Sequence, residues 1–111
     1  MMKGIKVMKQ KAGNTLYIRL DFKIGDEWES EQEAMESLEY LQKLTKERYL
    51  KAGLLGDLEA QIFDGALVIF EAKSYEEAEE LVKNDPIIKK GFYRYELYKW
   101  NIQLVSGEEG E

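Results

Sequence analysis

The sequence predicts an α+β fold of the order β-α-β-β-α-β, in which two helices cover one face of a four-stranded antiparallel sheet. Three observations lead to this prediction. Apolar and polar residues alternate over 16–22, motifs of the form Ser-x-x-Glu begin at Ser30 and Ser74, and residues 66–70 are almost all apolar. Alternation with a period of two is typical of a half-buried strand, and Ser-x-x-Glu is the capping box of a helix N-terminus. This order of elements is that of the ferredoxin-like fold.

The length and composition are those of a single domain. The chain has 111 residues, of which 44% are hydrophobic and 34% are charged. Domains usually have about 100–150 residues and about 25% charged residues. We assign residues 1–106 to one domain, with an extra candidate strand at 4–11. Residues 107–111 form an acidic, Gly-rich tail that we expect to be flexible.

The chain contains neither cysteine nor histidine, and this excludes several kinds of chemistry. Disulfides, thiolate nucleophiles, zinc sites built from Cys or His, and histidine general bases all require these residues. The formal net charge of −6 argues against a nucleic-acid partner, because phosphate contacts need clustered Lys and Arg. No apolar stretch approaches the ~18 residues of a membrane span. We expect a cytoplasmic protein with no membrane partner, no cofactor and no metal site.

A long helix is expected to follow the strand at 16–22. It starts at Ser30, carries acids in its first half and bases in its second half, as the helix dipole favours, and is expected to end at Gly53. An arginine beside the apolar stripe of such a helix has two possible roles. Its aliphatic side chain can carry the guanidinium to water, or the residue can line a pocket. The stripe consists of Ala34, Leu38, Leu41 and Ala52, with Thr45 inside it and Arg48 at its margin.

A hairpin is predicted in the middle of the chain. Residues 58–62 alternate as a second strand, and Asp64-Gly65 is a strong hairpin-turn signal. Residues 66–70 are expected to form a central strand that is buried on both faces. The second helix is expected to begin at Ser74 and to stop before Pro86, because the residue preceding a proline is disfavoured in the helical conformation.

The last strand is expected to run from Phe92 to Leu104 and to be apolar or aromatic on both faces. Two helices can cover only one face of the sheet, so the second apolar face must be buried elsewhere. We expect a homodimer in which two sheets pack face to face. The alternative is a monomer whose second face is covered by the N-terminal segment and the tail. The aromatic residues of this strand are Phe92, Tyr93, Tyr95, Tyr98 and Trp100.

Four segments carry a resemblance to a known family: Gly53-Leu54-Leu55, Gly65–Ala72, Ser74–Ala78 and, most specifically, Asn84–Tyr93 followed by Trp100. They resemble the YCII-related family, small proteins of the dimeric α+β barrel superfamily. The resemblance implies that this chain also forms a dimeric α+β barrel of ferredoxin-like subunits.

The resemblance also implies a site. In the family, the aspartate of the Asp-Pro motif is discussed as one half of a catalytic pair, and it corresponds to Asp85. Its histidine partner in the first helix would fall near Leu41 or Gln42, but this chain has no histidine. Asp85 is therefore the candidate catalytic residue. An aspartate before proline can also simply cap a helix or a turn.

The first functional hypothesis is a pocket between the sheet and the first helix that binds or transforms a small organic acid or aromatic compound. Arginines in such a pocket could hold an anionic group of the ligand, and tyrosines could orient it. The candidate ligand-binding residues are Arg19, Thr45, Arg48, Tyr49, Tyr93, Arg94 and Tyr95.

Three alternatives belong to other classes. One is a non-catalytic dimeric module for binding or structure that lacks the family histidine. Another is RNA binding with Tyr93 and Tyr95 stacked on bases, which the negative net charge opposes. The last is a Mg²⁺ or Ca²⁺ site with Asp57, Glu59 and Glu96 as ligands. Scattered acids are expected by chance where 34% of residues are charged, so we predict no metal site.

Overall fold

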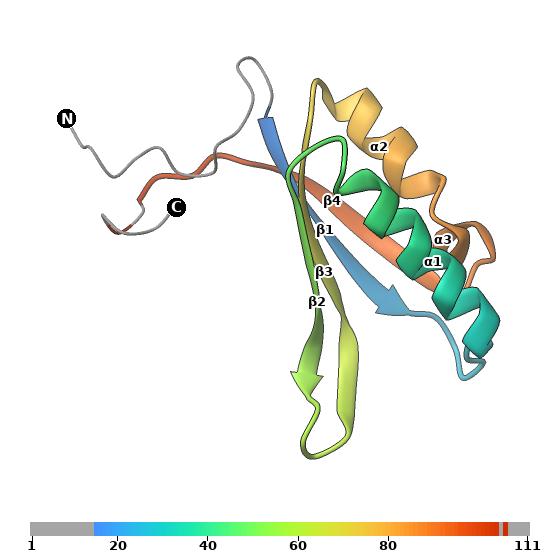
Figure 1. Cartoon of the computed structure of the whole chain (residues 1–111). Helices are drawn as coiled ribbons and strands as arrows, with labels where there is room; N and C mark the ends of the chain where they lie inside the picture. Colours follow the sequence, from blue (N-terminus) through green and yellow to red (C-terminus); the bar gives the residue numbers. More distant parts are fainter. Residues whose placement is uncertain (1–14, 105, 107–111) are drawn as a thin grey trace.

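The computed structural model describes residues 15–104 and 106. Figure 1 shows a twisted four-stranded sheet with its helices packed on one face. None of the helices in this part of the chain is long and apolar enough to cross a membrane. The elements in chain order are β1 (Thr15–Lys23), α1 (Glu31–Leu44), β2 (Leu50–Asp57), β3 (Ile62–Ala72), α2 (Tyr75–Lys83), α3 (Pro86–Lys89) and β4 (Tyr93–Trp100).

The sheet is antiparallel throughout, with the strand order β2-β3-β1-β4. The predicted α+β class and the ferredoxin-like order are therefore confirmed, with the single turn of α3 as an additional element. The last strand ends at Trp100, earlier than predicted. The candidate strand at 4–11 and the tail at 107–111 lie outside the described residues.

The first helix is shorter than the sequence predicted. It ends at Leu44, and the residues expected to form its last turns lead instead into β2, which contains both Ala52 and Gly53. This segment forms hydrogen bonds with the central strand β3 instead of continuing the helix. The Tyr49 N–H donates to Glu71 Oε1 at 2.8 Å, and the Glu71 N–H donates to Tyr49 O at 3.1 Å. The ladder between β2 and β3 satisfies the backbone groups that a longer helix would have paired locally.

The predicted strand at 58–62 and the turn at Asp64-Gly65 are also wrong. The turn occupies residues 58–61, where Asp57 Oδ1 accepts two backbone N–H groups at 3.1 and 3.2 Å and Gln61 has a φ of 61°. Asp64 and Gly65 lie within β3. The glycine is needed there because a Cβ would collide with the backbone of β1, and not because the chain turns.

Both predicted helix starts are confirmed. Ser30 Oγ accepts from the Glu33 N–H at 3.1 Å, and Glu33 Oε1 accepts from the Ser30 N–H at 2.8 Å, which completes a capping box. Ser74 Oγ accepts from the Glu77 N–H at 3.1 Å, while Glu77 Oε1 accepts from the Lys73 N–H. Both N-termini are thus set by side chains within four residues of the helix start.

Replacing Ser74 with alanine is expected to lower the free energy of unfolding by about 1 kcal/mol, because the first turn of α2 loses its acceptor. Ser74→Asn keeps an acceptor and is expected to retain most of the stability. Urea denaturation followed by circular dichroism measures both variants. Equal stability of Ser74→Ala and the wild type would contradict the N-cap role.

The hydrophobic core lies between the helices and the sheet, and two charged residues of β1 enter it. Arg19 is paired with Val68 of β3 and Leu97 of β4, both of which are core residues. Because side chains two apart in a strand share a face, Asp21 enters the same layer. Both charged side chains are buried, so each needs a charged partner. The core consists of Tyr17, Val68, Phe70, Ala72, Ala78, Val82 and Leu97.

Candidate functional site

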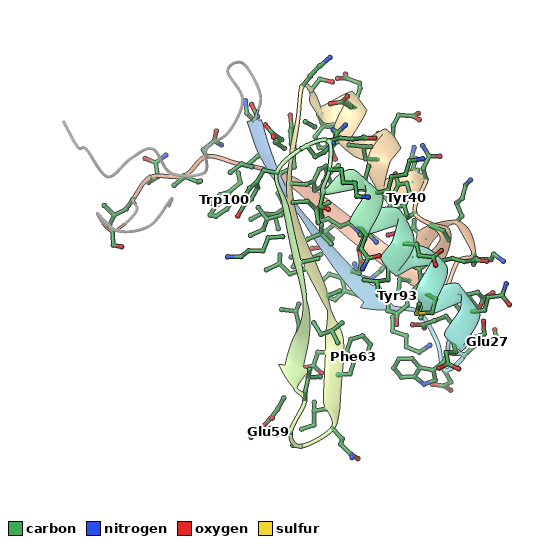
Figure 2. All side chains as sticks on the ribbon, viewed as in Figure 1. Glu27, Tyr40, Glu59, Phe63, Tyr93 and Trp100 are labelled. Atoms are coloured by element: carbon green, nitrogen blue, oxygen red, sulfur yellow. The ribbon has the colours of Figure 1, made fainter. Side chains whose placement is uncertain are left out.

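A cavity of about 440 Å³ lies between α1 and the helix-facing side of the sheet. Its walls are mainly apolar and come from α1, from β2 and β3, and from Ile87 of α3. Tyr93, which lines this cavity, is seen beside α1 in Figure 2. The polar side chains that line the cavity are Arg19, Asp21, Glu29, Ser37 and Tyr93.

Arg19 is the centre of a buried ion cluster, the triad of Asp21, Arg19 and Asp85. Arg19 Nε donates to Asp21 Oδ1, and Arg19 Nη2 donates to Asp21 Oδ2, both at 2.8 Å. On the other side of the guanidinium, Nη1 lies 2.9 Å from Asp85 Oδ2. Arg19, Asp21 and Asp85 are only 3%, 4% and 0% exposed. One cation therefore holds two carboxylates that are shielded from water.

The charge of Arg19 is maintained by its partners. Burial alone would lower the pKa of the guanidinium, because it removes water from the charged form. The hydrogen bonds to Asp21 and the negative charges of Asp21 and Asp85 outweigh this effect and raise the pKa of Arg19. With both aspartates ionised, the triad thus contains one positive and two negative charges.

Asp85 has two contacts, one to each carboxylate oxygen. Oδ1 accepts from the Ile87 N–H at 3.1 Å and caps α3, which starts with Pro86. Oδ2 faces Arg19 at ion-pair distance, although no N–H is aligned well enough to form a hydrogen bond with it. We regard this contact as an ion pair, because charge attraction at 2.9 Å does not require that alignment. Arg19 lines the cavity and Asp85 lies behind it.

Tyr93 and Glu29 form a second polar pair at the cavity. The Tyr93 hydroxyl lies 3.2 Å from Glu29 Oε1 and 3.4 Å from Oε2 and donates to this carboxylate. Glu29 immediately precedes the N-cap of α1, so the bond ties the start of the helix to β4. Burial, and then the charge and hydrogen bond of Glu29, raise the pKa of Tyr93 above its usual 10.0.

This shift predicts a pH dependence of stability. Below about pH 10 the tyrosine hydroxyl is protonated in the folded and the unfolded state. Above that pH the unfolded state loses the proton first, so the stability contributed by Tyr93 is lost as the pH rises through the folded pKa. Denaturation between about pH 9 and pH 11 is expected to show a smaller loss of stability for Tyr93→Phe than for the wild type. Parallel pH profiles would contradict the raised pKa of Tyr93.

Negative charges outnumber positive charges at the cavity. Asp21 and Glu29 line it and Asp85 lies behind the wall, while Arg19 is the one cation among the described lining residues. A carboxylate ligand would meet this excess of negative charge, whereas a ligand hydroxyl would meet hydrogen-bond acceptors. Within residues 15–104 and 106, no group of three His, Cys, Asp or Glu side chains is arranged to hold a metal ion.

Three ligand-binding candidates lie at the junction of α1 and β2 and do not line the cavity. Arg48 Nη1 donates to Glu71 O at 3.3 Å and lies 3.5 Å from Glu77 Oε1. Thr45 is the C-cap of α1, and its hydroxyl donates to a helix carbonyl at 2.6 Å. The Tyr49 backbone is bonded to Glu71. These contacts hold the α1–β2 connection against β3 and α2.

Two further candidates on β4 also lie outside the cavity wall. Arg94 is exposed on the face away from the helices, where its guanidinium lies 4.4 Å from the centroid of the Phe22 ring and Nη1 lies 3.1 Å from Glu96 Oε2. Tyr95 is partly buried against the hydrophobic core. Of the predicted residues, Arg19 and Tyr93 line the cavity, and Asp85 contacts Arg19 without lining it.

Three polar cavity residues were missed by the sequence reasoning. Asp21 follows Arg19 by two positions in a strand, and a charge pair at that spacing on one face is a signal that could have revealed it. Ser37 lies on the same side of the helix as Ala34 and Leu41, but it was not placed in the stripe. Glu29 precedes the N-cap and has no distinguishing local signal.

Comparisons with known proteins agree on the fold. The family model described as the YCII-related domain matches residues 10–101. A search of the curated proteins finds no match.

Two solved structures align with most of this chain. The 5-chloro-2-hydroxyhydroquinone dehydrochlorinase of Burkholderia phenoliruptrix, in complex with 2,5-dihydroxybenzoquinone, aligns over 78% of this chain and 93% of its own, with 20% identity and a TM-score of 0.54. The hydroxynitrile lyase of Passiflora edulis aligns over 82% of this chain and 98% of its own, with 14% identity and a TM-score of 0.46.

Proposed function

Because the chain belongs to the YCII-related domain family, we propose that it binds, and transforms, a small neutral aromatic compound with hydroxyl groups in the cavity between α1 and the sheet. The observation that carries this proposal is the mainly apolar cavity with the buried triad at its wall. Its volume of about 440 Å³ is in the range of small-molecule sites. The apolar walls favour a ring, and the carboxylates of Asp21 and Glu29 favour hydrogen-bond donors on that ring.

The charge balance selects between the two ligand classes that the sequence suggested. The Arg19 guanidinium already uses three nitrogens on Asp21 and Asp85. A small organic acid would therefore compete with two fixed carboxylates for one cation. The similar dehydrochlorinase structure holds 2,5-dihydroxybenzoquinone, and we carry that class of hydroxylated ring over to this chain as part of the proposal.

A direct test compares catechol with benzoate, which are similar in size. Catechol offers two hydroxyl groups as hydrogen-bond donors, whereas benzoate carries a negative charge. Catechol is expected to raise the melting temperature in a dose-dependent way, because a ligand that binds only the folded state stabilises it by mass action. Benzoate is expected to have a smaller effect. Ala52→Phe, which fills the cavity wall, is the control and is expected to abolish the catechol shift. Stronger stabilisation by benzoate would contradict the charge argument.

The second candidate function is a non-catalytic module, which the absence of histidine favours. It predicts that neither catechol nor benzoate shifts the melting temperature or the amide resonances of the cavity wall. The same titration, followed by NMR at residues such as Ser37 and Gly53, therefore separates the two functions.

Homodimerisation through the sheet is part of the proposal. Figure 2 shows Trp100 on the side of the sheet away from the helices. Several half-buried apolar side chains share this face with it, and a second copy would cover them. Light scattering is expected to give twice the 13.0 kDa mass of the chain, and Ile69→Lys is expected to give the monomer. Glu80→Lys on α2 is the control and should remain dimeric. The face contains Ile18, Leu20, Leu67, Ile69 and Trp100.

The cytoplasmic location stays a prediction.

A further inference from the structure

We propose that Asp21 is the carboxylate that contacts the ligand and accepts its proton, and that Asp85 is a positioning residue that acts through Arg19. This inference rests on the proposed function, because it assigns roles within the same cavity. It differs from the expectation that the resemblance suggested, in which Asp85 is the catalytic residue.

The position of the two carboxylates relative to the cavity separates their roles. Asp21 lines the cavity, whereas Asp85 is 0% exposed and lies on the other side of the Arg19 guanidinium. A ligand in the cavity can reach Asp21 and Arg19, whereas Asp85 contacts Arg19 and is not one of the residues that line the cavity. The group that can exchange a proton with the ligand is therefore on β1 and not in the Asp-Pro motif.

The contacts of Arg19 orient Asp21. Two parallel hydrogen bonds of 2.8 Å to Nε and Nη2 fix the plane of the Asp21 carboxylate. Asp85 fixes the other end of the guanidinium, and Asp85 is itself held by the Ile87 N–H. Each Asp21 oxygen uses one lone pair on Arg19 and keeps another for a ligand hydroxyl.

The triad can take up one proton through Asp21. Two buried carboxylates share one guanidinium, so the triad carries an excess negative charge in surroundings that solvate charge poorly. When the O–H bond of the ligand breaks, its proton moves to an Asp21 oxygen and the electron pair stays on the ligand oxygen. The triad becomes neutral, and the new negative charge lies beside Arg19, which also lines the cavity and stabilises it. The other ionisable groups that line this cavity are Glu29 and Tyr93.

The test uses catechol as the probe and three isosteric variants of the full chain. Asp21→Asn is expected to weaken catechol binding about tenfold or more, because a hydrogen bond to a charged acceptor is lost. Asp85→Asn is expected to lower the melting temperature but to keep most of the affinity at a temperature where it is folded. Asp64→Asn, at an exposed position of β3, is the control for the loss of one charge and should match the wild type.

A spectroscopic readout distinguishes direct contact between Asp21 and catechol from a purely structural role of Asp21. The resonance of the Arg19 Nε–H, which is bonded to Asp21, is expected to shift when catechol binds to the wild type and to Asp85→Asn, but not when it is added to Asp21→Asn. If Asp85→Asn does not fold, Asp85→Ser replaces it, because serine keeps an acceptor for the N-terminus of α3.

The outcomes distinguish this inference from the proposed function. Catechol binding that survives Asp21→Asn unchanged, or that is lost equally in folded Asp85→Asn, overturns the assignment of Asp21 but leaves the cavity as a ligand site. No binding of catechol to the wild type overturns the proposed function, and the assignment of Asp21 with it.

Discussion

Arg19→Met is expected to lower the free energy of unfolding at neutral pH by about 3–5 kcal/mol, because it leaves two buried carboxylates without their cation. Asp21 and Asp85 would then face each other's negative charge in a site that is almost closed to water. Chemical denaturation followed by circular dichroism measures this loss.

Arg94→Met is the matched control for this variant. Arg94 also has a carboxylate partner, Glu96 at 3.1 Å, but its side chain is 55% exposed. Surface ion pairs contribute at most about 1 kcal/mol, so the control is expected to cost little stability. A loss for Arg19→Met as small as that for Arg94→Met would show that the triad is not the main electrostatic element of the core.

Gly65→Ala is expected to cost about 3 kcal/mol, because the core cannot accept an additional group at this point without moving backbone. A Cβ on residue 65 would lie 2.3 Å from the Asp21 carbonyl oxygen, and this oxygen belongs to the backbone of β1. The collision would push β1 away from β3 at the position of the triad. The variant should therefore lose catechol binding as well as stability, which thermal unfolding and titration measure together.

The control for Gly65→Ala is Gly53→Ala on the neighbouring strand. A Cβ at residue 53 would meet nothing within 4 Å. Because alanine restricts the unfolded chain more than glycine does, this variant is expected to be neutral or to gain about 0.5 kcal/mol. Equal losses at both positions would mean that general strand flexibility, and not the contact with Asp21, explains the need for glycine.

The sequence was most informative where the determining contacts are local. The Ser30 and Ser74 caps bond to groups within four residues, and both helix starts were predicted correctly. The end of α1 was wrong because its basic residues and Gly53 are compatible with a helix, whereas the competing contact comes from Glu71 on β3. A local pattern contains no information about which distant strand will pair with a segment.

The candidate site was also predicted only in part, because local patterns do not reveal contacts between distant residues. Asp85 and Arg19 were both named as candidates, but for different roles, and nothing in their spacing indicates that the two side chains form an ion pair at 2.9 Å. From the sequence, Asp21 was taken only as one of the polar residues that alternate with apolar residues along the strand. Its burial depends on the helices that cover β1, which the alternation does not reveal. Arg48, Thr45 and Tyr49 were assigned to the pocket because the helix was taken to continue past residue 44.

The class of fold, the order of the elements, the two helix starts and the exclusion of cysteine and histidine chemistry could all be predicted from the sequence. These follow from composition and from contacts between near neighbours along the chain. Three features could not be predicted: the residue at which α1 ends before β2, the face of β1 that enters the core, and the carboxylate that lines the cavity. They depend on contacts between residues far apart in the sequence, such as Arg19 with Asp85, and these contacts form only when the helices pack on the sheet.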